Sequence, residues 1–289
     1  MLKHIPKERL RIGLALGAGG ARGFAHIPVL EAFDELGLKP VVVSGASIGA
    51  IVGAGYCAGM SGAEIRAYVH ELFRRRSDVV ARLWRTRPRT ARELLAPGGL
   101  RFGQFDAERL LGAFLPDTIP ADFADLEIPL KVVASDYYGW KETVLHEGNL
   151  RKAIAASVAI PVLFRPVLIE GRVMVDGTVF DPVPFDAVTP HTDIVVAVDV
   201  IGGPTGPANR VPSPTEAIFG TTQLLMRAIL AEKLRRPNAP QILVKPAISS
   251  FRLLDFMKVN AILKAAEPVK DEVKRALDRA IAKHATAHA

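Results

Sequence analysis

A serine flanked by glycines is the residue of this sequence best suited to act as a nucleophile. Ser47 lies in Gly45-Ala46-Ser47-Ile48-Gly49, which matches the pattern G-x-S-x-G. Valines precede the motif and a glycine-rich apolar stretch follows it, so it falls at a strand-to-helix turn. A side chain two positions before or after the serine would collide with the adjoining strand or helix, which explains the two glycines. The pattern therefore predicts a nucleophile elbow.

A serine hydroxyl needs a base to accept its proton. None of the histidines has a persuasive setting, because they fall near the chain ends, inside predicted helices or before a strand; they are His4, His26, His70, His146, His191, His284 and His288. Asp176 is the better candidate, since it directly follows the short apolar run 173–175 and precedes a turn glycine. Taken without the serine motif, an ordinary Asp-Gly turn is the commoner explanation.

A glycine-rich turn follows the first predicted strand. Gly17, Gly19 and Gly20 precede Arg22, and the turn opens a helix, where backbone N–H groups can hold negative charge. A nucleotide P-loop is excluded because no Lys-Ser or Lys-Thr pair follows. A dinucleotide site lacks the carboxylate required at the end of the second strand. An oxyanion hole for acyl transfer remains, alongside a plain tight turn.

Strands and helices alternate along the chain, which predicts a three-layer α/β/α sandwich with a mostly parallel central sheet. The predicted strands are 12–16, 41–43, 130–134, 143–145, 173–175, 194–198 and 241–244. The predicted helices are 21–36, 50–58, 64–73, 107–114, 150–156, 214–234 and 254–284. The active site is expected beyond the carboxyl ends of the strands.

Composition restricts the class of protein further. The chain has 289 residues, of which 49% are hydrophobic and 23% charged, as expected for a globular protein. Its single cysteine, Cys57, cannot form an internal disulfide, and no export signal is found, so a cytoplasmic location is expected. Residues 40–63 carry no charge over a length that could span a bilayer. Their glycines and serines favour instead a strand, a turn and a helix of a soluble α/β fold.

These motifs together resemble the patatin-like phospholipase family. That family combines a glycine-rich oxyanion motif carrying a basic residue with G-x-S-x-G and a later Asp-Gly. Ala156-Ser157-Val158-Ala159-Ile160-Pro161 resembles the family's alanine-serine segment, and Asp181-Pro182-Val183-Pro184 resembles the stretch after its aspartate. The resemblance is strong over about residues 10–200. We therefore expect a catalytic core over 10–200 and a helical extension over 201–289 packed on the same domain.

The resemblance implies a serine hydrolase without a catalytic histidine. Ser47 would be the nucleophile and Asp176 the base, and Gly17, Gly19, Gly20 and Arg22 would form the anion-binding side. The implied substrate is an acyl ester of a lipid, such as a phospholipid or lysophospholipid, and no cofactor or metal is required. A carboxylesterase or thioesterase using the same dyad, and a catalytically weak lipid-binding regulatory protein, remain the alternatives. Thr178 and Ile48 depart from the usual family residues at their positions.

Arginines crowd the segment that contains Trp84. They are Arg74, Arg75, Arg76, Arg82, Arg85, Arg87, Arg89 and Arg92. Lys and Arg exceed Asp and Glu by 37 to 30, giving a formal charge of +7. Arginines beside an indole favour peripheral contact with an anionic membrane, with a solvated surface as the alternative. Nucleic acid is not expected as a partner, because no recognised binding motif accompanies the charge.

Overall fold

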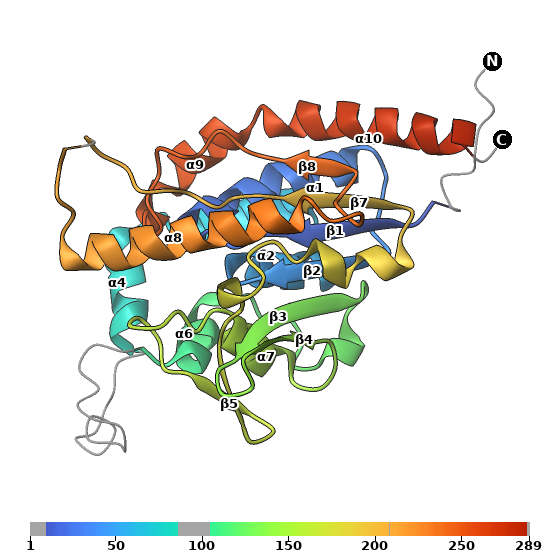
Figure 1. Cartoon of the computed structure of the whole chain (residues 1–289). Coiled ribbons are helices and arrows are strands. Elements are labelled where there is room, and N and C mark those ends of the chain that lie inside the picture. Colours follow the sequence, from blue (N-terminus) through green and yellow to red (C-terminus); the bar gives the residue numbers. More distant parts are fainter. Residues whose placement is uncertain (1–9, 86–104, 208, 288–289) are drawn as a thin grey trace.

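A computed structural model describes residues 10–85, 105–207 and 209–287 of the chain (Figure 1). Within these ranges eight strands form one sheet, along which the order β5-β6-β3-β2-β1-β7-β8 runs while β4 pairs with β3 off this path. The strands are β1 (Ile12–Leu16), β2 (Val42–Ala46), β3 (Leu130–Asp136), β4 (Lys141–Leu145), β5 (Val167–Ile169), β6 (Arg172–Asp176), β7 (Ile194–Val198) and β8 (Ile242–Val244).

The sheet is parallel in one part and antiparallel in another. Strands β3, β2, β1, β7 and β8 are parallel to one another, whereas β4 and β6 run antiparallel to β3, and β5 runs antiparallel to β6. The central parallel strands β1 and β7 are apolar and buried along their whole length, as expected for a sheet covered on both faces. The expected α/β/α architecture is confirmed, and the sheet is mixed because the chain returns through two hairpins beside β3.

Helices cover both faces of the sheet. They are α1 (His26–Glu35), α2 (Ile48–Cys57), α3 (Gly62–Leu72), α4 (Arg76–Arg85), α6 (Ala107–Phe114), α7 (Leu150–Ser157), α8 (Pro214–Lys233), α9 (Val259–Ala266) and α10 (Val269–Ala287). Alternate residues of β1 enter two separate cores: Leu14 and Leu16 pack with α1, α2, α7, α9 and α10, while Ala15 packs on the side of α8. Helix α8 crosses the front of the sheet in Figure 1.

Local sequence signals explain where several helices begin. Ser61 and Ser213 each start a capping box with a glutamate three residues later, at α3 and α8 respectively. The helix expected over 21–36 begins instead as the 3-10 turn η2 (Gly20–Ala25) before α1. The helix expected over 254–284 begins instead as the 3-10 turn η7 (Phe256–Lys258) before α9, and it is broken between α9 and α10 at Pro268, which cannot continue a helix.

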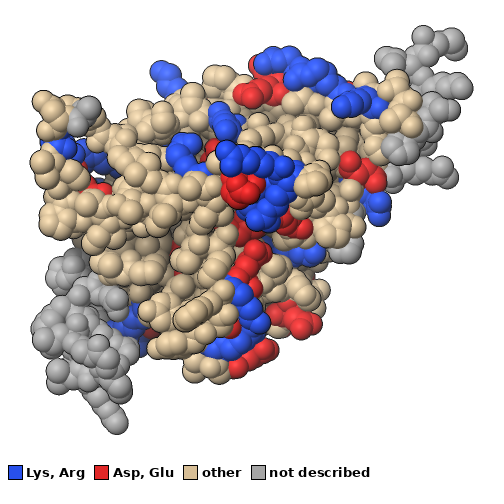
Figure 2. Space-filling model, viewed as in Figure 1, with Lys and Arg blue, Asp and Glu red and all other residues tan. Residues whose placement is uncertain are grey.

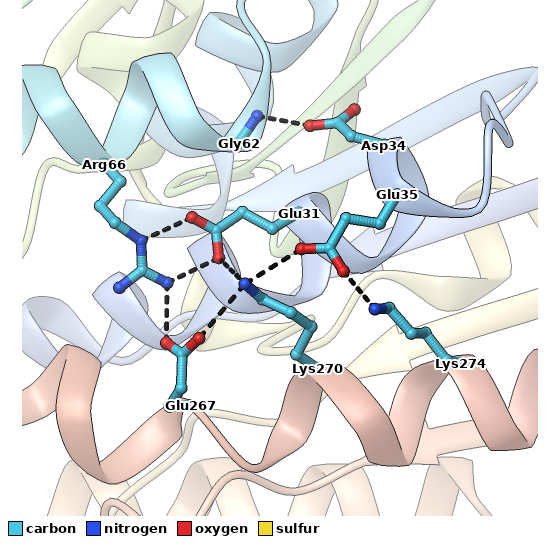
Figure 3. Close-up of polar contacts among 8 residues, drawn as sticks. All are labelled: Glu31, Asp34, Glu35, Gly62, Arg66, Glu267, Lys270 and Lys274. Atoms are coloured by element: carbon cyan, nitrogen blue, oxygen red, sulfur yellow. Dashed lines mark hydrogen bonds and ion pairs between the residues drawn. The ribbon is translucent and has the colours of Figure 1, made fainter.

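The chain after residue 201 is part of the same layered structure. Strand β8 pairs with β7, and a cluster of ion pairs ties α10 to the first helices (Figure 3). Glu31 of α1, only 7% exposed, pairs with Arg66 at 2.5 Å and with Lys270 at 2.8 Å. Lys270 also contacts Glu35 and Glu267. Such mutually satisfied charges hold the C-terminal helices against α1 and α3.

Charges of both signs are interspersed on the face drawn in Figure 2. Blue and red side chains stand close together there, so the excess of basic residues forms no single patch on this face. Among the described residues, no helix is both long and apolar enough to cross a membrane. The uncharged run 40–63 is accounted for by β2, the following turn, α2 and the start of α3.

Candidate active site

The turn at Ser47 has the strained backbone of a nucleophile elbow. Ser47 lies between the end of β2 and the start of α2 with φ 54° and ψ −122°, a conformation that residues with side chains rarely adopt. A Cβ on Gly45 would stand 2.6 Å from the backbone of Gly49, and a Cβ on Gly49 would overlap the carbonyl of Leu16. Both glycines are therefore needed for the close approach of β1, β2 and α2.

Strands β2 and β6 meet end to end beside β3. Strand β4 pairs with residues 132–136 of β3, so β2 and β6 must share the opposite side of β3. On that side, Ala46 is paired with Val133 and Asp176 with Ala134. The two strands run toward each other, so Ala46 and Asp176 lie one residue apart along β3, and Ser47 directly follows Ala46. The sheet thus joins two residues that lie far apart in the sequence.

Asp176 is a fully buried carboxylate. Its Oδ1 accepts the N–H of Thr178 at 2.9 Å, whereas Oδ2 has no well-formed hydrogen bond among the described residues. Burial raises the pKa of Asp176 to about 6, against smaller lowering effects of hydrogen bonds from Thr178 and Ser47. The carboxylate is thus a stronger base than an exposed aspartate, and it is still mostly ionised at pH 7.

A hydroxyl group from α7 fixes the elbow to β3. Ser157 donates its hydroxyl proton to the carbonyl of Val133 at 2.6 Å and accepts the backbone N–H of Ser47 at 2.8 Å. This bridge lies where β2 gives way to β6 along β3. The sequence identifies Ser157 only as part of a segment that resembles the family. Its positioning of Ser47 becomes visible only in the fold.

The loop after Asp176 is held by a buried ion pair. Lys233, near the end of α8, lies 2.6 Å from Asp181 and 3.1 Å from Asp186. Lys233 is 4% exposed and Asp181 is fully buried. Burial raises the pKa of Asp181, and Lys233 opposes that effect. Sequence reasoning missed this pair, because nothing in the sequence of α8 marks Lys233 as buried.

The glycine-rich turn leaves a few backbone N–H groups uncommitted. The N–H of Gly17 donates to Val198 at 3.0 Å, so Gly17 is engaged in the sheet and cannot serve an oxyanion. Within the described part of the chain, Gly19 and Gly20 donate to no protein acceptor. Ile48, as the first residue of α2, also has no partner within its helix. Gly20 and Ile48 line the same cavity as Ser47.

Ile48 was not among the expected donors. The pattern could have identified it, because the residue after the nucleophile supplies one oxyanion N–H in elbow architectures. Its side chain also fills the space beside Gly23, where a Cβ would overlap it. Isoleucine therefore fits at position 48 only because residue 23 is a glycine.

His26 is buried and holds the glycine-rich turn. Its Nε2 lies 2.8 Å from the carbonyl oxygen of Gly17, so this nitrogen carries the donated proton. Burial lowers the pKa of His26 to about 4, which keeps the ring neutral at pH 7. His26 therefore supports the glycine-rich turn from within.

Arg22 is engaged by backbone carbonyls. Its Nε donates to Val200 at 3.1 Å and its Nη1 to Phe251 at 3.0 Å, and the side chain is 1% exposed. Burial, with repulsion from Arg227, lowers the pKa of Arg22 to about 10, so the group stays charged. The expectation that this guanidinium faces a substrate anion is revised, because these contacts direct it to the loops after β7 and before η7.

An apolar cavity of about 410 Å³ opens beside Ser47, within the size range of ligand sites. Ser47 and Tyr68 supply the hydroxyl groups of its lining, which otherwise consists of glycine, apolar and aromatic residues from η2, α1, α2, α3, α4, α6 and two later segments. Leu253 and Phe256 belong to the second of these segments, beyond residue 201. Among the described residues, no three His, Cys, Asp or Glu side chains are grouped as metal ligands.

The arginine-rich segment is described only in part. Arg74, Arg75 and Arg76 are exposed, and Arg74 pairs with Glu71 at 3.0 Å. Arg82 of α4 donates to the carbonyl of Ala113 at 2.6 Å near the end of α6. The remaining expected members Arg87, Arg89 and Arg92 lie outside the described residues, as do the side chains of Trp84 and Arg85.

A serine on a strained strand-to-helix turn, within a layered α/β fold and over an apolar cavity, places this chain in the class of α/β proteins that present a nucleophile elbow. The sequence profile of the patatin-like phospholipase family matches residues 14–189. The chain therefore belongs to that family, and the resemblance drawn from its motifs is confirmed.

Individual relatives agree with this assignment. An uncharacterised NTE family protein of Mycobacterium tuberculosis is 34% identical over 223 residues, which cover 72% of this chain and 58% of that protein. The mouse patatin-like phospholipase domain-containing protein 6 is 26% identical over 267 residues, covering 90% of this chain and 18% of that protein. The chain thus spans only part of the length of either relative.

The solved structures that are similar to this chain have low sequence identity to it. VipD from Legionella pneumophila is 14% identical, with 94% of this chain and 67% of that chain covered and a TM-score of 0.49. Human GIVD cytosolic phospholipase A2, in complex with a fluorophosphonate, is 15% identical, with 96% and 60% covered and a TM-score of 0.49.

Proposed function

We propose that this protein hydrolyses acyl esters of lipids, either phospholipids or lysophospholipids, through a Ser47–Asp176 dyad and an acyl-enzyme intermediate. The observation that carries the proposal is the meeting of β2 and β6 beside β3, which brings a strained serine to a buried carboxylate whose Oδ2 has no well-formed hydrogen bond among the described residues. Membership of the patatin-like phospholipase family supports the substrate class.

Acylation begins when Ser47 Oγ attacks the ester carbonyl carbon and its proton passes to Oδ2 of Asp176. The carbonyl oxygen becomes an oxyanion, which the N–H groups of Gly19, Gly20 and Ile48 stabilise. The intermediate then collapses, the bond to the leaving alcohol breaks, and Asp176 returns the proton to the departing oxygen. A base with a pKa of about 6 suits both transfers, because it accepts and releases a proton near neutral pH.

Deacylation repeats these steps with water. Water attacks the acyl carbon while Asp176 accepts its proton, and the same N–H groups hold the second oxyanion. Collapse releases the fatty acid, and the proton on Asp176 returns to Ser47 Oγ. The cavity beside Ser47 holds the acyl chain, because its apolar walls remove the alkyl surface from water.

The test is hydrolysis of a lipid panel by the wild type and by the folded Ser47→Ala and Asp176→Asn variants. Phospholipids, lysophospholipids, triglycerides, simple esters and thioesters are compared, with released fatty acid measured by mass spectrometry. The proposal expects the highest kcat/KM on a phospholipid or lysophospholipid and almost none in either variant. Preference for a thioester or a simple ester would reject the proposal in favour of a thioesterase or carboxylesterase. A wild type without turnover would reject it in favour of a lipid-binding protein of the same fold.

We further propose that the exposed arginines Arg74, Arg75 and Arg76, at the start of α4, draw a cytoplasmic enzyme to anionic membranes. Arg75 and Arg76 stand at the start of a helix that lines the cavity, and each basic side chain near an anionic surface contributes about 1 kcal/mol. Replacing Arg74, Arg75 and Arg76 by Gln should weaken binding to vesicles containing phosphatidylglycerol. Arg82 is retained because it caps α6. Wild-type binding that ignores both salt and anionic lipid would refute this attraction.

A further inference from the structure

The turn between β3 and β4 exposes three aromatic side chains in four residues. The strands pair as far as Asp136, so the turn consists of residues 137–140. Within it, Tyr137, Tyr138 and Trp140 are 57%, 75% and 82% exposed. Aromatic side chains of this size usually supply buried area to a core or an interface, and a group of them left in solvent marks a contact surface.

The turn is built to hold these rings outward. Asp136 accepts the N–H of Gly139 at 2.8 Å, and the N–H of Tyr137 donates to Val173 of β6 at 2.9 Å. The rings of Tyr137 and Tyr138 meet edge to face with their centroids 5.0 Å apart. Trp140 has φ 54°, a left-handed conformation that a tryptophan adopts only where its surroundings require it. The exposure is therefore a property of an ordered turn.

The register of the sheet places this turn at the edge that carries the site. Val133 of β3 is paired with Ala46, the residue before Ser47, and β3 runs parallel to β2. Tyr137 lies four residues further along β3, which at ~3.3 Å per residue places the turn roughly 13 Å beyond the elbow in the same direction. The turn that carries the rings consequently lies beyond Ser47 along the strand direction, at the carboxyl edge of the parallel strands.

We propose that this aromatic turn binds the interfacial region of a phospholipid bilayer and holds the carboxyl edge of the sheet against the lipid. The inference rests on the proposed function, in which the substrate comes from that surface. Tyrosine and tryptophan favour the membrane–water interface, where the ring is partly buried and its polar atom stays hydrated. Lys141, exposed beside Trp140, suits the phosphate level of the same interface.

A lipid surface fits this position better than a protein partner does. The cavity beside Ser47 is apolar and takes a lipid substrate in the proposed function, and the strand register places Ser47 and the turn at the same edge of the sheet. A bilayer that contacts the turn supplies that substrate directly. A protein or a second copy bound there would instead stand between the site and its lipid.

The test uses Trp140 as its own reporter. In a Trp84→Phe background Trp140 is the remaining tryptophan of the sequence. Vesicles of phosphatidylcholine with brominated acyl chains should shift its emission to the blue and quench it. The measurement is made in 1 M salt, where a Debye length of ~3 Å suppresses attraction by the arginines. No blue shift and no quenching at saturating lipid would overturn the proposal.

A second measurement compares variants by sedimentation with phosphatidylcholine vesicles in the same salt. We expect Tyr138→Ser with Trp140→Ser to lower the partition coefficient about tenfold or more, because two large apolar surfaces lose their burial. The matched controls are Val41→Ser, at the opposite edge of the sheet, and Leu225→Ser on α8, which remove exposed apolar groups elsewhere. Equal partition of the aromatic variant and the controls would overturn the proposal.

The outcomes separate this surface from the proposed chemistry. The aromatic variant should retain wild-type kcat/KM on a soluble short-chain ester, and Ser47→Ala should retain vesicle binding. Wild-type ester hydrolysis without vesicle binding would reject the docking surface alone, whereas vesicle binding without hydrolysis would reject the proposed function alone. A wild-type dimer in gel filtration that the aromatic variant abolishes would assign the turn to a second copy and overturn the lipid assignment.

Discussion

Replacing Asp176 by Asn should make the protein more stable while removing its activity. In the native state burial raises the pKa of this carboxyl from its ordinary value of 3.8 to about 6. A raised native pKa means that the ionised carboxylate destabilises the folded state once the pH exceeds 3.8. Asparagine has the same shape, retains an oxygen for the N–H of Thr178 and carries no charge, so it removes that destabilisation.

The size of the effect follows from the pKa difference. The rise of the pKa from 3.8 to about 6 corresponds to about 3 kcal/mol of destabilisation of the folded wild type. This destabilisation is fully present above pH 6 and absent below pH 4, where the carboxyl is protonated in both the folded and the unfolded state. For a chain of this length, such a gain raises Tm by about 5 °C. The gap between variant and wild type should therefore open as the pH rises from 4 to 6 and then remain constant.

Thermal and urea unfolding of both proteins between pH 4 and pH 8 measure this gap. Circular dichroism at pH 8 verifies that the variant is folded, and ester hydrolysis verifies that it is inactive. The amide that replaces the carboxyl carries no proton that titrates, so a gap independent of pH would refute the burial of a charged carboxylate. A variant less stable than the wild type at pH 8 would refute it equally, since the charge would then be stabilised in the fold.

Three further results are expected. Ser157→Ala should lower kcat about tenfold or more with little change in KM, because the N–H of Ser47 loses its acceptor. A loss of activity that only matches a loss of folded protein would indicate a folding defect instead. The kcat/KM of the wild type should fall about tenfold per pH unit below a midpoint near 6, and His26→Gln should leave that midpoint in place; a shift of the midpoint in this variant would assign the base to a histidine. Lys233→Met should reduce the free energy of unfolding by about 3–5 kcal/mol, and adding Asp181→Asn should restore much of that loss. A double variant that is less stable in urea than Lys233→Met alone would contradict the buried pair.

The sequence predicted much of the fold because strand periodicity and turn residues are local signals. The valines before Ser47 and the glycines around it specify a strand, a sharp turn and a helix, and these form as expected. The short strand β5 and the helix α4 were not anticipated. The three residues of β5 carry too little pattern, and the arginines of α4 favoured the interpretation of that segment as a membrane-contacting or solvated surface rather than as a helix.

The site was predictable in its residue types and less so in its connections. The motifs pointed to Ser47 and Asp176, and the fold brings them to facing strand ends. The contacts of Arg22 and Ser157 depend on segments distant in the sequence, so no local pattern could assign them. Gly17 is a similar case, because only its pairing with β7 shows that its N–H is already engaged.

Labelling by a fluorophosphonate tests the Ser47–Asp176 dyad most directly. Wild type and Asp176→Asn are treated at pH 8, and peptide mass spectrometry follows the rate at which the phosphonyl group appears on Ser47. We expect a single adduct on Ser47 in the wild type and a rate about 10²–10⁴-fold lower in Asp176→Asn, the range that a general base contributes. An adduct on another residue, or equal rates in the two proteins, would contradict the dyad.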